Sequence, residues 1–148
     1  MNDCKNYGEP NNWISILEKH KDLYLCFAHF GGLGLCQKGD SWADEIISIL
    51  KSKKYKNVYT DLSCFIQNGR FAKAQNIIRA NPDIADKILY GSDFDMLPLF
   101  YNSNITSLAS YITTFRNMFN NSILLNGKNK NLFDMLTIEN PWRFMFER

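Results

Sequence analysis

The chain has 148 residues, and 45% of them are hydrophobic, which is enough to build one respectable core. Its 17 basic and 15 acidic residues leave a formal charge of +2, too small to create the field that attracts nucleic acid or an anionic membrane. We therefore expect a single domain over residues 1–148, with neither a nucleic-acid nor a membrane partner.

The chain carries no sign of a targeting segment or a metal-binding cysteine motif. No apolar stretch approaches the length of about 18 residues that a membrane span requires, and the polar start of the chain does not resemble a secretory signal. We expect a cytoplasmic protein. We interpret the cysteines as structural, because no pair has C-x-x-C spacing. They are Cys4, Cys26, Cys36 and Cys64.

The first part of the chain predicts helix, strand and helix in turn. A helix is expected from near Asn12, and the apolar run over 23–30, followed by two glycines, is typical of a strand buried in a parallel sheet. Ser41 opens a candidate capping box for the next helix. The apolar residues of that helix have the spacing of one buried face: Ala43, Ile46, Ile47 and Leu50.

The same alternation continues further along the chain. Segment 57–63 predicts a second strand, a weaker helix over 71–78 stops at the Asn81-Pro82 pair, and 87–90 predicts a third strand. An apolar helical stripe over 108–119 indicates a core helix, and a loop is expected over 126–129. We expect the aromatic residues near the carboxyl terminus to pack against the sheet or its helices. The alternation of strand and helix predicts an α/β fold with a parallel sheet.

Three predicted strands each end in a residue that can carry chemistry: His29, Asp61 and Asp93. The carboxyl ends of parallel strands meet at one edge of a sheet, so we expect these side chains to converge on one small ligand or ion. A histidine there can act as a general base or a metal ligand, and an aspartate can bind a cation or orient water. Each residue alone is more often a helix cap or a backbone partner, but the three together favour a functional site.

The glycines after the first predicted strand do not make a nucleotide-binding loop. When the motif G-x-G-x-x-G is counted from Gly32, its third glycine is replaced by Gln37. Glycines that let the backbone turn sharply beside a site are the simpler interpretation.

The three strand-end motifs resemble one family. FAHFGG at 27–32, NVYTDLS at 57–63 and LYGSDFD at 89–95 are similar to strands six, seven and eight of amidohydrolase-related enzymes. These are the metal-dependent TIM-barrel hydrolases and decarboxylases of the amidohydrolase superfamily. Segment 138–144 also resembles the closing segment of the family. The resemblance implies a partial TIM barrel of about three parallel βα units followed by carboxyl-terminal helices.

The resemblance also implies roles for individual residues. His29 matches the sixth-strand histidine that contacts the substrate or the activated water, and Asp93 matches the eighth-strand aspartate that binds the metal and helps deprotonate that water. Asp61 has no family role to transfer, and we interpret it as a helix cap or a supporting partner of the site. A divalent metal, zinc by resemblance, and a small-molecule substrate with a carbonyl-type group follow from the family.

One departure from the family pattern limits what this chain does alone. The first-strand H-x-H pair and the fifth-strand histidine are absent, and only His20 and His29 exist. Because a catalytic zinc site normally has three protein ligands, we expect the chain to be the carboxyl-terminal part of such an enzyme, inactive by itself. Three strands cannot close a barrel, so we expect two exposed sheet edges and either self-association or pairing with a missing amino-terminal half.

Two other functions fit the same residues. One is a small α/β binding module that uses this edge of the sheet without catalysis. The other is a subunit that completes a barrel with another chain, because three βα units leave apolar surface to cover.

Overall fold

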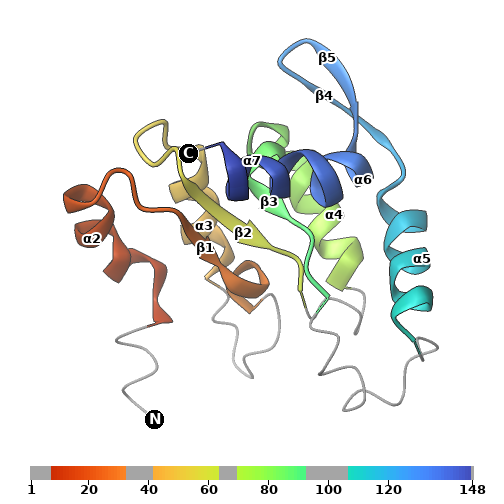
Figure 1. The fold of residues 1–148 in the computed structure, drawn as a ribbon, viewed down its shortest axis with the longest axis horizontal. Helices are drawn as coiled ribbons and strands as arrows, with labels where there is room; N and C mark the ends of the chain where they lie inside the picture. The colour runs from red at the N-terminus through yellow and green to blue at the C-terminus, as the bar shows by residue number, and fades with distance from the viewer. Residues whose placement is uncertain (1–7, 33–41, 64–69, 93–106, 148) are drawn as a thin grey trace.

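The predicted α/β class is confirmed by a computed structural model, which describes residues 8–32, 42–63, 70–92 and 107–147. Its centre is a three-stranded parallel sheet with the order β1-β2-β3. These strands are β1 (Leu25–Phe27), β2 (Val58–Asp61) and β3 (Ile88–Leu89). Figure 1 shows the sheet at the middle of the molecule, with helices around it. The described strands form no closed barrel.

Helices and short helical turns follow each strand, as the alternation predicted. The helices before β3 are α2 (Ile14–Lys19), α3 (Ala43–Lys51) and α4 (Arg70–Ala80), and those after it are α5 (Leu108–Phe119), α6 (Leu132–Asp134) and α7 (Asn140–Phe146). The shorter turns are η1 (Pro10–Trp13), η2 (Ala28–Gly32), η3 (Pro82–Lys87) and the π-helical η5 (Met135–Glu139). Ser41, the predicted cap of α3, lies outside the described residues, and the residue directly before that helix is Trp42.

The two faces of the sheet are covered by different parts of the chain. Paired residues of parallel strands point to the same face, so Val58 and Ile88 share one face, while Tyr59 and Leu89 share the other. The first face joins the main core, together with Ile46 and Leu50 of α3. On the second face, the ring of Phe144 in α7 packs edge-on against Tyr59, with ring centroids 5.0 Å apart.

The carboxyl-terminal aromatic residues follow the prediction only in part. Phe144 packs on the sheet, but Trp142, Met145 and Phe146 are 50–60% exposed. The ring of Trp142 contacts that of Phe146 instead, at a centroid distance of 4.6 Å. The prediction that these aromatic residues pack against the sheet or its helices is therefore confirmed for Phe144, whereas α7 leaves Trp142 and Phe146 largely exposed on a side that is also apolar.

The loop predicted over 126–129 is the turn of a β-hairpin. Strands β4 (Ser122–Leu125) and β5 (Lys128–Asn131) pair in antiparallel fashion across Asn126 and Gly127, both of which have positive φ. This is the backbone of a two-residue type I′ turn, for which Asn-Gly is the strongest sequence signal. The helical stripe over 108–119 is confirmed as core for Tyr111, Phe115 and Phe119, which are completely buried, whereas Leu108 and Ile112 are exposed.

The outer edge of β3 is not exposed, contrary to the expectation of two open edges. On the side away from β2, the carbonyl of Ile88 accepts a hydrogen bond from the Asn140 side chain at 2.7 Å, and the backbone N–H of Tyr90 donates to the carbonyl of Leu136 at 2.8 Å. The carboxyl-terminal segment therefore takes the place of a fourth strand at this edge. Because Asn140 is fully buried, both of its amide hydrogens are used inside the protein.

Candidate functional site

The structure brings His29 and Asp61 together, as the strand-end positions predicted. His29 follows β1 and Asp61 ends β2, and the backbone N–H of His29 donates to Oδ1 of Asp61 at 2.9 Å. Asp93, the third residue predicted for this site, lies outside the described residues. Gly91, two positions before it, is described and lies against Ser63, at the same end of the sheet.

The chain after β1 forms a left-handed turn at this site. His29, Phe30 and Gly31 have φ values of 57°, 48° and 67°. A non-glycine residue in this region costs about 1–2 kcal/mol, so the surroundings must hold the turn in place. The complete burial of the Phe30 ring and the hydrogen bond from His29 to Asp61 provide that restraint.

One carboxylate oxygen ties the turn to the end of β2. Oδ1 of Asp61 accepts from the backbone N–H of His29, from the backbone N–H of Ser63 at 3.0 Å, and from the Ser63 hydroxyl. The bond to the residue two positions on is an Asx-turn, which ends the strand. Asp61 is therefore a positioning group in this structure, because Oδ1 is already surrounded by three donors.

Ser63 links Asp61 to the imidazole ring of His29. Its Oγ lies 2.8 Å from His29 Nδ1, and its backbone carbonyl oxygen lies 3.3 Å from the same nitrogen. Ser63 is only 5% exposed. The end of β3 supports it from the other side, since the Tyr111 hydroxyl donates at 2.7 Å to the carbonyl of Gly91, which packs on Ser63.

The thiol of Cys26 is the fourth polar group of the cluster. Its Sγ lies 3.8 Å from Oδ2 of Asp61. Burial, together with the charge of Asp61 and the hydrogen bond to it, raises the pKa of the Cys26 thiol to about 12. A thiol that stays protonated at neutral pH is a poor nucleophile and a poor metal ligand. This agrees with the interpretation of Cys26 as structural.

A cavity of about 330 Å³ opens beside His29. Among the described residues, its wall is mostly apolar and includes Phe27, Trp42 and Ile46, with His29 as the ionisable group. The backbone of Gly31 also lines it, and a Cβ at that position would come within 2.9 Å of both Trp42 and Ile46. An apolar pocket with one placed polar group has the composition of a small-molecule site.

The described residues do not fit a metal centre by themselves. Within those ranges, no three His, Cys, Asp or Glu side chains gather where they could hold a metal ion. Oδ1 of Asp61 already accepts three hydrogen bonds, and His29 Nδ1 faces Ser63. The described residues therefore provide no metal-binding set of their own.

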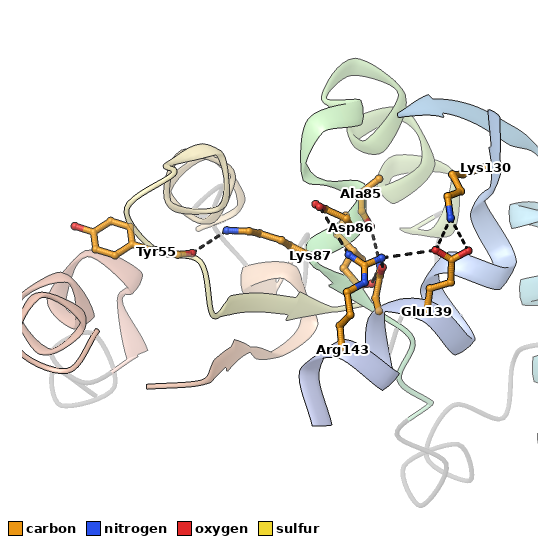
Figure 2. A network of polar contacts seen from close by, with 9 residues as sticks. Tyr55, Ala85, Asp86, Lys87, Lys130, Glu139 and Arg143 are labelled. Atoms are coloured by element: carbon orange, nitrogen blue, oxygen red, sulfur yellow. Dashed lines mark hydrogen bonds and ion pairs between the residues drawn. The ribbon is translucent and has the colours of Figure 1, made fainter. Parts of the chain in front are cut away.

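A second polar cluster lies at the opposite end of the sheet (Figure 2). Lys130 pairs with Glu139 at 2.8 Å, and Arg143 lies 3.7 Å from Glu139 and 3.9 Å from Asp86. Lys87 donates to the carbonyl of Tyr55 at 2.8 Å. The contact of Arg143 with Asp86 connects α7 to η3, and the pair of Lys130 and Glu139 connects β5 to η5. We interpret the cluster as structural, since its ion pairs and the bond of Lys87 join neighbouring segments of the chain.

Sequence reasoning missed Ser63 and the position of Cys26. Ser63 belongs to the VYTDLS motif, and its place two residues after Asp61 is the usual spacing of an Asx-turn, which was an available signal. The residues next to Ser63 in the sequence do not indicate that its hydroxyl lies against His29, which is 34 positions away.

Comparisons of the chain with protein families, with curated proteins and with solved structures found no match. The family resemblance therefore depends on the strand-end motifs and on segment 138–144 alone. Among the described residues, no helix has the length and apolar character to cross a membrane.

Proposed function

We propose that this chain is the carboxyl-terminal part of an amidohydrolase-related hydrolase, or of a related decarboxylase, with a partial TIM-barrel fold. Its parallel strands would correspond to the sixth, seventh and eighth of the barrel. The observation that carries the proposal is the contact of His29 with Ser63 and Asp61, at the carboxyl ends of two adjacent parallel strands. The small-molecule substrate would lie in the cavity beside His29.

In this proposal His29 transfers the proton during attack on a carbonyl-type group. An imidazole is suited to that task near neutral pH, because it both accepts and returns a proton. Its ring is held at Nδ1 by Ser63, and its backbone is held by Asp61. A divalent metal, zinc by resemblance, would bind to Asp93 and to ligands outside this chain.

Reconstitution tests the proposal. The chain would be co-expressed with a segment that carries an H-x-H pair and a further histidine, taken from the coding sequence upstream of Met1. We expect the complex to bind a divalent metal and to hydrolyse members of an ester and amide panel. Asp93→Asn should abolish metal binding, as measured by elemental analysis.

His29→Asn separates proton transfer from metal binding. Asparagine tolerates the left-handed backbone at this position, so we expect metal content to persist while turnover falls by at least about 100-fold. His20→Asn is the matched control, since His20 is exposed at the end of α2 and should leave turnover unchanged. Unchanged metal affinity in Asp93→Asn, or the absence of an H-x-H segment upstream in every frame, would reject the proposal.

A self-contained binding module is the second candidate, and the closed edge of β3 favours it. Asn140 and Leu136 occupy the hydrogen-bonding positions that a first barrel strand would need. A barrel that closed at this edge would have to displace both. A purified chain that is monomeric, unfolds cooperatively and takes up no divalent metal would favour the module over the enzyme part.

A further inference from the structure

We infer that the cavity beside His29 binds an uncharged aromatic group of about two fused rings. This group would be the apolar part of the substrate, so its role in hydrolysis rests on the proposed function, whereas the binding itself does not. The cavity has the properties that such a ligand needs in the fixed position of Trp42, the chemistry of its wall and its volume.

Trp42 forms part of the wall and lies against a glycine at each end of its side chain. Its backbone N–H donates to the carbonyl of Gly31 at 3.3 Å, and a Cβ on Gly31 would lie 2.9 Å from that of Trp42. At the far end of the ring, a Cβ on Gly8 would lie 2.9 Å from Cη2. The backbone packed against both ends of the indole therefore fixes its position in the wall.

The chemistry of the wall favours an uncharged ligand. Phe27 and Trp42 supply aromatic rings, and Pro10 and Ile46 supply aliphatic surface. Among the described residues of the wall, no side chain carries a carboxylate, an ammonium or a guanidinium group. A charged group placed against Phe27 and Trp42 would lose its hydration without gaining a partner, which disfavours binding. The part of the ligand that lies against these residues is therefore uncharged.

The two aromatic rings favour an aromatic ligand over an aliphatic one of the same size. Ring pairs attract one another through offset or edge-on contacts, in addition to the area that they bury. A rigid planar ligand also loses less conformational entropy on binding than an alkyl chain, whose rotatable bonds become fixed. Phe27 and Trp42 can both make such ring contacts, because both line the cavity.

The volume of the cavity sets the size of the ligand. An apolar cavity of about 150 Å³ accommodates one benzene ring. The cavity beside His29 encloses about 330 Å³, roughly twice that volume, which corresponds to two fused rings. A ligand that fills this space also contacts His29, which lines it.

Titration calorimetry with 2-naphthol tests the inference on the whole chain. Hypoxanthine is a planar bicycle of similar size with polar edges, and 1-octanol is an apolar alcohol without rings. We expect 2-naphthol to bind saturably at one site, and at least about fivefold more tightly than either of the other compounds. Similar affinities for 2-naphthol and either other compound, or no saturable binding of 2-naphthol, would overturn the inference.

Two tryptophan substitutions locate the binding site. Trp42→Ala removes one aromatic ring from the wall, so the affinity for 2-naphthol should fall by at least about fivefold. Trp142→Ala is the matched control, because Trp142 is 58% exposed on α7 and does not line the cavity. An unchanged affinity in Trp42→Ala, or an equal loss in Trp142→Ala, would contradict the inference, since the probe would then bind elsewhere.

Phe27→Leu decides the question if Trp42→Ala does not fold. Leucine keeps an apolar side chain of similar size in the wall, so we expect the fold to persist. The ring is lost, and the preference for 2-naphthol over 1-octanol should fall by at least about twofold. An unchanged preference in this variant would reject the aromatic selectivity that we infer.

Turnover by the reconstituted complex separates this inference from the proposed function. The methyl esters of 2-naphthylacetic acid and decanoic acid share a leaving group, and we expect the higher kcat/KM for the naphthyl ester. Binding of 2-naphthol in the cavity without any hydrolytic activity would support this inference and reject the proposed function. Hydrolysis that favours the decanoate ester would support the proposed function and overturn this inference.

Discussion

The side chain of Asn140 donates to the carbonyl of Ile88 at 2.7 Å and to the carbonyl of Ala85 at 2.8 Å, and its own oxygen accepts from Arg143 at 3.0 Å. These bonds attach α7 to the edge of β3 and to the segment before it. Figure 2 shows Arg143 between Asp86 and Glu139 at this contact. This buried amide and the carbonyl of Leu136 together cover the outer edge of β3.

Asn140→Ala should destabilise the protein by about 2 to 4 kcal/mol, because it leaves two buried carbonyl groups without donors. Urea unfolding followed by circular dichroism measures the loss. Asn117→Ala is the control, since Asn117 is exposed on α5 and its removal should change stability by no more than about 0.5 kcal/mol. Equal effects of the two substitutions would show that Asn140 does not hold this edge.

Gly31→Ala and Gly127→Ala should separate backbone strain from steric overlap. Both glycines have positive φ, which costs alanine about 1–2 kcal/mol. Nothing lies within 4 Å of a Cβ at Gly127, whereas one at Gly31 would approach Trp42 and Ile46 at 2.9 Å. We expect Gly31→Ala to cost about 1–3 kcal/mol more than Gly127→Ala in the same unfolding assay. Similar costs would mean that the turn beside His29 has room to relax.

Phe115→Ala should lower the free energy of unfolding by about 3–5 kcal/mol. The ring is fully buried, stacks on Phe119 at a centroid distance of 4.5 Å, and contacts Tyr90 at 4.8 Å. Phe146→Ala makes the same chemical change at a ring that is 60% exposed, so its effect should be much smaller. A comparable loss of unfolding free energy at both positions would indicate that Phe146 is buried against another molecule in solution.

The Cys26 thiol should be slow to alkylate in the folded protein until strongly alkaline pH. Burial and Asp61 raise its pKa from the ordinary 9.0 to about 12, so the folded chain keeps a proton that the unfolded chain loses between these values. The free energy of unfolding should therefore fall as pH rises from 9 to 12, and this fall should be smaller in Cys26→Ala.

Iodoacetamide labelling measures this thiol by itself when Cys4, Cys36 and Cys64 are replaced by serine. Asp61→Asn removes the neighbouring charge and should move the reaction to lower pH. Fast labelling of the folded chain near pH 9 would show that the thiol is more accessible than its surroundings indicate.

Local pattern was sufficient to predict the α/β class, the positions of the three parallel strands, the buried face of α3 and the buried aromatic residues of α5. Periodicity and strand ends are properties of neighbouring residues, and the meeting of His29 with Asp61 follows from the geometry of parallel strands. The Asn-Gly signal of the β4–β5 hairpin was also present, although we expected only a loop there.

Only the tertiary structure decided which side chains complete the site and where the sheet ends. The contact of Ser63 with His29 and the closure of the β3 edge by Asn140 join residues 34 and 52 positions apart. The sequence alone determined that chemically capable residues end the strands, because that depends on local alternation. Folding determined that Ser63 lies against His29 and that Asn140 bonds the edge of β3 in place of a neighbouring strand, because such bonds depend on how distant segments pack.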